Sequence, residues 1–343
     1  MPSAQPELDA TTEEQFLASV GPQLRQLASR RQALRGATLR YGGALLAAGL
    51  LGAIVLLLVF RGRPELAHLA VPALAAGVVG AIWIGVRNQR RWGSEAHSTL
   101  LPAACEVLPG GLDYTAEAPV DDILKPFEAL NLVGHSNRRK VNHRLTGEYR
   151  DRQFEVAHAN LRRKSGGGKN STTTTVFQGL LLRIQTRQRV EAGITVGPKA
   201  GAIMQLFSGA SVPTGNDAFD EAFQVQLDPD TDESRREMGQ VLDAPMQDAL
   251  LAVADSEGRA ADNRPTFQAG FKYDSLYIAL SRTETAPLIG PLKTERPRPF
   301  LRPGLHLRAE VDLEQAAVDM LRDIHTIHRI IDRLPDGAAA RED

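Results

Sequence analysis

The sequence predicts an α+β protein in which a two-helix transmembrane hairpin precedes a soluble domain with a mainly antiparallel sheet and a long C-terminal helix. Two uncharged runs of about 20 residues, 41–60 and 66–86, predict the hairpin. Runs typical of strands then follow one another without the regular alternation of strand and helix that a parallel sheet requires. Apolar residues recur at helical spacing over residues 311–334, which predicts a long amphipathic helix at the end of the domain.

Each uncharged run can cross the hydrocarbon core of a bilayer at about 1.5 Å per residue, so both are predicted transmembrane helices. The link at 61–65 is a short external loop that allows only a tight reversal. The alternative, two buried helices of a soluble core, would need a large apolar shell that the polar remainder of the chain does not offer. His68, near the outer end of the second run, is the deepest ionisable group, so a pore or proton relay built from the hairpin alone is not expected.

Arginines flank the hairpin unequally. The link holds only Arg61 and Arg63. The segments before the first run and after the second run hold Arg25, Arg30, Arg31, Arg35, Arg40, Arg87, Arg90 and Arg91. By the positive-inside rule, this asymmetry predicts that both termini are cytoplasmic. Tyr41, Trp83 and Trp92 are then expected near the inner headgroups, where amphipathic aromatic rings settle.

The net charge of −1 hides an uneven distribution. Residues 1–92 hold ten basic and five acidic residues (10 − 5 = +5), which leaves 30 basic and 36 acidic residues after residue 92 (30 − 36 = −6). The soluble part is therefore not expected to be a general nucleic-acid binder. Cys105 is the single cysteine, so no intrachain disulfide can form, as is usual for proteins of a reducing compartment.

Residues 1–40 are predicted to be a cytoplasmic tail that contains an amphipathic helix. Its apolar stripe consists of Phe16, Val20, Leu24, Leu27 and Leu34. This helix either lies on a surface or in a coiled coil, or it packs on the soluble domain, and Gly21-Pro22 is a candidate break. Small residues four apart in the spans, such as Ala73 and Gly77, predict close helix packing, either within the hairpin or in a dimer.

A juxtamembrane helix is predicted at 87–110 and the soluble α+β domain at 111–334, followed by a disordered tail at 335–343. Strands are expected at 112–115, 144–149, 153–161, 176–187, 194–196, 222–227, 267–271 and 276–280, the last two as a hairpin around 272–275. Helices are expected at 94–107, 120–132, 232–254 and 311–334, the third of them bent at Pro245. The Gly- and Thr-rich segment 165–175 is predicted to be a mobile loop, and the Pro-rich segment 283–304 is predicted to be irregular.

No motif in the chain predicts catalysis, and no catalytic, cofactor-binding or metal-ligating residue is assigned. The Gly-Lys pair at 168–169 does not make a phosphate-binding loop, because Arg163 stands where that motif needs its first glycine and Asn170 follows the lysine. His325 and His328 are three residues apart on the last helix but lack a third ligand, so a polar helix face is expected instead of a metal site. An active site assembled from scattered residues stays open as an alternative.

Basic residues are concentrated in segment 138–169, which holds ten of them against three acids. The candidate contact residues for lipid or a partner are Arg138, Arg139, Lys140, Arg162, Arg163 and Lys164. Held under the inner leaflet, such a segment would lie against anionic headgroups. Alternatively, the acidic residues of segment 217–237 neutralise these basic residues. The simplest interpretation is that the basic segment is an ordinary solvated face.

Several segments of the soluble part carry a resemblance to a known family. They are Val176–Leu181, Phe219–Val225, Phe267–Leu280 and Ile324–Leu334. With the two N-terminal spans, this order resembles a bacterial family of membrane proteins catalogued as domain of unknown function 3137. The resemblance covers most of 112–334 and implies an inner-membrane protein, but its motifs are structural and give no active-site residues.

The hypothesis that follows is a protein with two spans in the inner membrane, whose cytoplasmic domain acts as a protein-interaction or scaffolding module. Its expected partners are the lipid bilayer and either another protein or a second copy of this chain. No cofactor and no nucleic acid are expected. The alternatives are a membrane-attached enzyme with a site assembled from scattered residues, and sensing of anionic lipid by the basic segment 138–169.

Overall fold

The computed structural model describes residues 10–61, 68–167, 171–199, 211–257, 267–281, 283–289, 292–297, 307 and 312–335. Most of the predicted link at 61–65, the first nine residues and most of the predicted C-terminal tail lie outside these residues. The chain divides into two compact units. The helical unit comprises residues 10–104 and 302–320, and the sheet unit comprises residues 1–9, 105–301 and 321–343. Each unit is described by itself.

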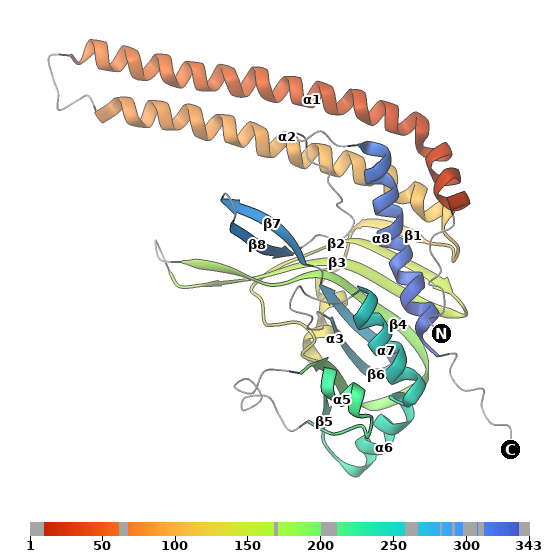
Figure 1. Ribbon diagram of the computed structural model, residues 1–343. Coiled ribbons are helices and arrows are strands. Elements are labelled where there is room, and N and C mark those ends of the chain that lie inside the picture. Colours follow the sequence, from red (N-terminus) through yellow and green to blue (C-terminus); the bar gives the residue numbers. More distant parts are fainter. Residues whose placement is uncertain are drawn as a thin grey trace. The chain divides into compact units, whose positions relative to one another are not determined.

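Two long helices dominate the helical unit: α1, Ala10–Val59, and α2, Ala70–Val107 (Figure 1). Each joins a predicted span to the amphipathic segment beside it in one continuous helix. The predicted break at Gly21-Pro22 is wrong, because α1 runs through Pro22. Phe16, Val20 and Leu24 are all buried, so packing on both sides of the proline holds the helix across the missing hydrogen bond.

The helices α1 and α2 pair antiparallel in a regular register. Arg30 bonds Glu95, and Asn88 Nδ2 donates to Thr38 Oγ1 over 2.8 Å. Farther along α1, small residues of the two spans meet. A Cβ built on Gly49 would lie 2.9 Å from the Cα of Gly77, so only glycine permits this approach. The hairpin itself therefore uses these small residues. Within the helical unit, Arg30 and Thr38 of α1 contact α2.

The sheet unit contains a six-stranded antiparallel sheet in the order β1-β2-β3-β4-β5, with β6 on the other side of β4. Its strands are β1 Asp113–Glu117, β2 Arg138–Tyr149, β3 Arg152–Ser165, β4 Thr172–Pro198, β5 Phe223–Asp228 and β6 Phe267–Ser281. Strand β4 is long enough to pair with β3 through its first half and with β5 through its second half. These strands confirm the α+β class and the antiparallel sheet.

Helices cover the two faces of this sheet differently. On the face called here the α3 face, helix α3, Val120–Ala129, packs its Leu124 and Phe127 on Ala157, Leu181 and Tyr277. On the opposite face, called here the α8 face, lie α7, Ala244–Glu257, and the C-terminal half of α8, Leu313–Arg333 (Figure 1). His328 of α8 contacts the rings of Tyr149 and Phe154 there. The short helices α5, Asp217–Ala222, and α6, Asp232–Val241, complete the unit.

Three predictions about the sheet unit are wrong, and the mobile loop predicted at 165–175 is wrong in part, because 172–175 pair with β3. Residues 272–275 are no hairpin turn, because β6 is continuous through them and stays paired to β4 across irregularities, with Tyr273 at φ 54°. The segment predicted to be irregular at 283–304 contains the paired strands β7, Thr283–Ile289, and β8, Leu292–Pro297. Antiparallel pairing supplies the backbone partners that the proline-rich composition did not suggest.

The predicted helix at 232–254 is broken rather than bent. Helix α6 ends at Val241 and α7 begins at Ala244, because Asp243 accepts a hydrogen bond from the backbone N–H of Met246 over 3.0 Å and so caps a new helix. Pro245 then lies in the first turn of α7, where its missing N–H costs no intrahelical bond.

Candidate functional surfaces

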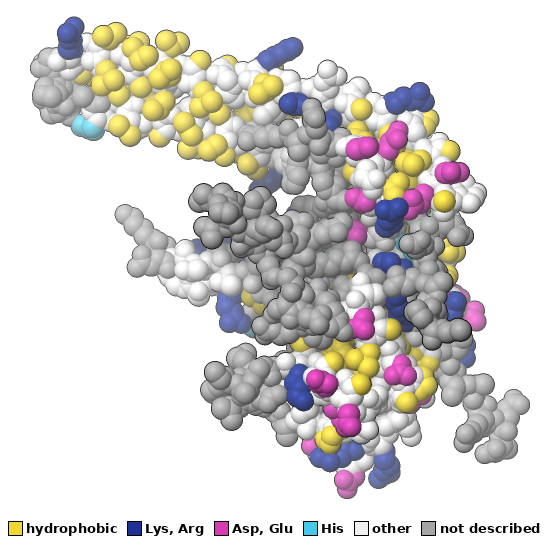
Figure 2. Space-filling model, viewed as in Figure 1, with side chains coloured by type: hydrophobic (Ala, Val, Ile, Leu, Met, Phe, Trp, Pro, Cys, Tyr) yellow, Lys and Arg dark blue, Asp and Glu magenta, His cyan; other side chains and the backbone are white. Residues whose placement is uncertain are grey.

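Large apolar side chains are exposed along the outer parts of α1 and α2. In the described residues, both helices are long and apolar enough to cross a membrane. Leu51, Val59 and Val71 are each more than 60% exposed, and Figure 2 shows such side chains gathered along this part of the molecule. A water-soluble surface does not carry a continuous apolar belt of this kind, so the hairpin is a candidate membrane-spanning element.

Of the three aromatic residues predicted near the headgroups, two are exposed and one is buried. Tyr41 and Trp83 are 63% and 59% exposed, and the guanidinium of Arg87 lies 5.2 Å from the ring of Trp83. Trp92, in contrast, is fully buried, so its predicted place at the headgroups is wrong. It stands one helical turn from the buried Ala96 and belongs to the apolar interior at the base of the hairpin.

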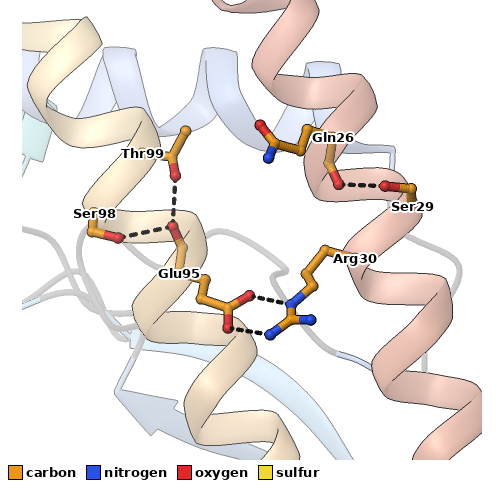
Figure 3. Close-up of polar contacts among 6 residues, drawn as sticks. All are labelled: Gln26, Ser29, Arg30, Glu95, Ser98 and Thr99. Carbon is orange, nitrogen blue, oxygen red and sulfur yellow. Dashed lines mark hydrogen bonds and ion pairs between the residues drawn. The ribbon is translucent and has the colours of Figure 1, made fainter.

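Polar contacts join the two helices at this base (Figure 3). Arg30 Nε and Nη2 donate to the two carboxylate oxygens of Glu95 over 3.1 and 3.3 Å. Beside this ion pair, Thr99 Oγ1 donates back to the carbonyl of Glu95 within α2. Both charged side chains are exposed, so the pair sets the register more than it adds stability.

In the described residues, the α3 face of the sheet also bears an open polar concavity of about 1000 Å³ beside the part that α3 covers. We call the base of this concavity the polar floor. It consists mainly of Arg144 and Thr146 on β2, Glu155 on β3, Arg183 and Gln185 on β4 and Asp274 on β6. Thr146, Glu155, Arg183 and Tyr277 follow one another directly across four strands, so their side chains share one face.

Charges on the polar floor are paired. Arg144 Nε lies 2.6 Å from Glu155 Oε1, and Arg183 Nη2 lies 3.9 Å from Asp274 Oδ1. Arg183 also donates to Ser275 Oγ over 3.0 Å and lies over the ring of Tyr277, where the covered core begins. A carboxylate held by a guanidinium is poorly placed to take a proton from a substrate, whereas such pairs recognise charged groups well.

The structure divides the predicted basic contact residues between the two faces of the sheet. Arg139 turns to the α3 face, where it forms ion pairs with Glu128 and Asp121 of α3 at 3.0 and 3.4 Å. On the same face, Arg163 donates to the carbonyl of His135 over 3.1 Å. Arg138, Lys140, Arg162 and Lys164 lie on the opposite face of β2 and β3 and are exposed.

His325 and His328, which sequence spacing singled out, lie on α8 with their ring centroids 6.0 Å apart. Among the described residues, no group of three or more His, Cys, Asp or Glu is arranged to hold a metal ion. His328 is 1% exposed, and in the described structure neither of its ring nitrogens has a hydrogen-bond partner. Burial lowers the pKa of His328 from 6.5 to about 4, helped by the nearby His325 and opposed by Asp332.

Buried polar groups also line β1 and β2. Tyr114 Oη lies 3.0 Å from Nδ1 of His143, and burial raises the pKa of Tyr114 to about 12. Burial likewise raises the pKa of Cys105 to about 12, so this thiol is inert at neutral pH.

Sequence reasoning did not find the polar floor, because its residues come from four strands and meet only through the sheet register.

Comparisons with known proteins leave the family open. No family model and no curated protein matches the sequence. One solved structure, the mycobacterial trehalose monomycolate transport factor A, TtfA, shares 11% identity over 71% of this chain and 96% of that chain, with a TM-score of 0.29. A likeness at this level supports no argument about fold or activity. The resemblance to the family numbered 3137 therefore stays a prediction.

Proposed function

We propose that this protein is a membrane-anchored interaction module. The hairpin of α1 and α2 would span the inner membrane, and the sheet unit would bind a protein partner, or a second copy of this chain, on the cytoplasmic side. The apolar belt on the outer parts of the two helices supports the anchorage. The excess of arginine at the open end of the hairpin supports cytoplasmic termini.

The polar floor carries the interaction part of the proposal. Part of the α3 face is closed by α3 with an apolar core, while the polar floor beside it presents charged side chains in register on the sheet. The ion pairs there are partly exposed, so a partner's charged groups can replace them without leaving a buried charge unpaired. The concavity is wide and open, which suits a protein surface better than a small substrate enclosed for catalysis.

Gln153 of β3 also lines the concavity above the polar floor, and a photo-crosslinking residue in its place tests the interaction in intact cells. We expect a discrete adduct, either with a second copy of this chain or with one defined partner. Reversing Arg144 and Arg183 to Glu should abolish that adduct, because it inverts the charge pattern of the floor. Reversing Arg189, which pairs with Glu191 on β4 outside the floor, is the matched control and should leave the adduct unchanged.

The anchorage has its own test. The full chain should remain with membranes after alkaline carbonate extraction, and reporters fused to either terminus should report the cytoplasm. A chain that stays in solution without detergent contradicts the anchorage. A membrane-bound chain that gives no adduct from Gln153 contradicts only the interaction.

A further inference from the structure

Four basic side chains lie on one face of the end of the sheet that β2, β3 and β4 form, called here the arm. Arg138 of β2 stands directly opposite Arg162 of β3. Lys140 of β2, which is opposite Asn160, and Lys164 of β3 each lie two residues from this pair, on its two sides, because the strands are antiparallel. Residues directly opposite each other in an antiparallel pair, and those two apart on one strand, share a face about 5 to 7 Å apart. Beyond Arg162, β3 and β4 pair only with each other in the described residues, so they continue as the two-stranded tip of the arm (Figure 1).

This face differs from the opposite face of the same strands. There, Arg139 is neutralised by two carboxylates of α3. Among the described residues, none of the four basic side chains on the arm has an acidic partner, and Arg162 Nε instead donates to the amide oxygen of Asn160 over 3.0 Å. Like charges directly opposite each other destabilise a strand pair, so the arrangement opposes folding unless an anionic partner is bound.

The chemistry of the arm limits the class of that partner. Thr173 and Thr175 of β4 stand opposite Lys164 and Arg162, so hydroxyl donors lie beside two of the four positive charges. Ammonium, guanidinium and hydroxyl groups together suit phosphate oxygens. Residues 162–175 contain no aromatic side chain on which a base could stack, and the chain after residue 92 is acidic overall, both of which disfavour nucleic acid.

We propose that this face of the arm binds the anionic phospholipid headgroups of the membrane in which the hairpin is anchored. The proposal rests on the anchorage proposed above, because a tethered domain meets the membrane surface at a high effective concentration. Weak contacts then suffice, and each basic residue near an anionic surface increases occupancy about fivefold. The arm would thereby make the orientation of the sheet unit depend on lipid charge.

A fluorescent label at Thr173→Cys tests this in the full-length protein reconstituted in nanodiscs. Cys105 is 6% exposed and its thiol is inert, so a cysteine on the arm can be labelled selectively. The quencher is a spin label on the lipid headgroup, and the discs contain either neutral lipid alone or one third phosphatidylglycerol. We expect strong quenching only in the anionic discs, its loss in high salt, and weaker quenching of a label at Thr174→Cys, which faces the other way.

Charge reversal of Arg138, Lys140, Arg162 and Lys164 to Glu should lower the bound fraction in anionic discs at least tenfold, while Arg138→Lys with Arg162→Lys should retain it. The matched control reverses four exposed basic residues elsewhere in the sheet unit: Lys125, Arg187, Arg189 and Arg236. Circular dichroism confirms that each variant is folded.

Equal quenching in neutral and anionic discs would overturn the proposal. An equal loss of quenching in the control variant would also overturn the proposal, because net charge rather than the arm would then explain the binding. Binding of a single-stranded oligonucleotide in place of any response to lipid would assign the arm to nucleic acid. Failure of the chain to enter nanodiscs would count against the anchorage itself and is distinguishable from all of these.

Discussion

Large apolar side chains are buried in the sheet unit and exposed along the outer part of the hairpin. In the sheet unit, Leu124 and Phe127 are at most 2% exposed and form a core between α3 and the sheet. In the outer part of the hairpin, Leu51 is 62% exposed, and the interior contact between the helices is made by Gly49 and Gly77. This difference supports the proposed anchorage, because lipid would give no reason to bury leucine and would favour close backbone contact instead.

Removing the same side chain from the two regions should give the largest contrast. Leu124→Ala should destabilise the sheet unit by about 2–5 kcal/mol, since it leaves a cavity under α3. Leu51→Ala should leave the stability of the sheet unit unchanged. Pulse proteolysis of the solubilised full chain across a urea series measures both. Equal effects would mean that Leu51 also belongs to a folding core.

A charge introduced in the outer part of the hairpin should test directly whether this part lies in the bilayer. Leu51→Arg should oppose membrane insertion by about 2.5–3.5 kcal/mol, because arginine is costly near the centre of a bilayer. Leu39→Arg, equally exposed but beside Arg40 at the edge of the span, is the control and should insert normally. The fraction extracted by carbonate measures both. Extraction of Leu51→Arg at the wild-type level would contradict the span.

Acid should act on the sheet unit and spare the hairpin. The folded-state pKa of His328, about 4, lies below its ordinary value of 6.5. The contribution of neutral His328 to the free energy of unfolding is therefore full above pH 6.5 and is lost as the pH falls toward 4. The expected loss is about 2–3 kcal/mol. His328→Phe should flatten this pH dependence in thermal melts, whereas His135→Phe, at an exposed position, should not. An unchanged slope in His328→Phe would assign the acid sensitivity to another group.

The smallest effect is expected at the ion pair between Arg30 and Glu95. Both side chains are exposed, so a double-mutant cycle of Arg30→Ala and Glu95→Ala should show little coupling, and less in high salt. Phe16→Ala, a change in the buried stripe of the same helix, is the comparison and should destabilise the base of the hairpin clearly. A large coupling would mean that the pair is shielded from water.

Prediction from sequence succeeded where a pattern is local. The uncharged runs, the strands around 150–152 and the closing helix were all predicted close to their observed places. It failed where a partner elsewhere in the chain decides the outcome. Polar residues 272–275 suggest a turn, yet they lie in a strand because β4 pairs with them, and Trp92 suggests a headgroup anchor, yet it is buried.

The sequence by itself determined that the chain has two membrane-length apolar helices, an antiparallel sheet and a basic segment, because periodicity and charge are properties of neighbouring residues. Only the tertiary structure decided which charges act together. Strand register paired Arg139 with the acids of α3, left Arg138 and Arg162 facing each other, and assembled the polar floor from four strands. Side chains distant in sequence become neighbours through backbone pairing, which no local pattern records.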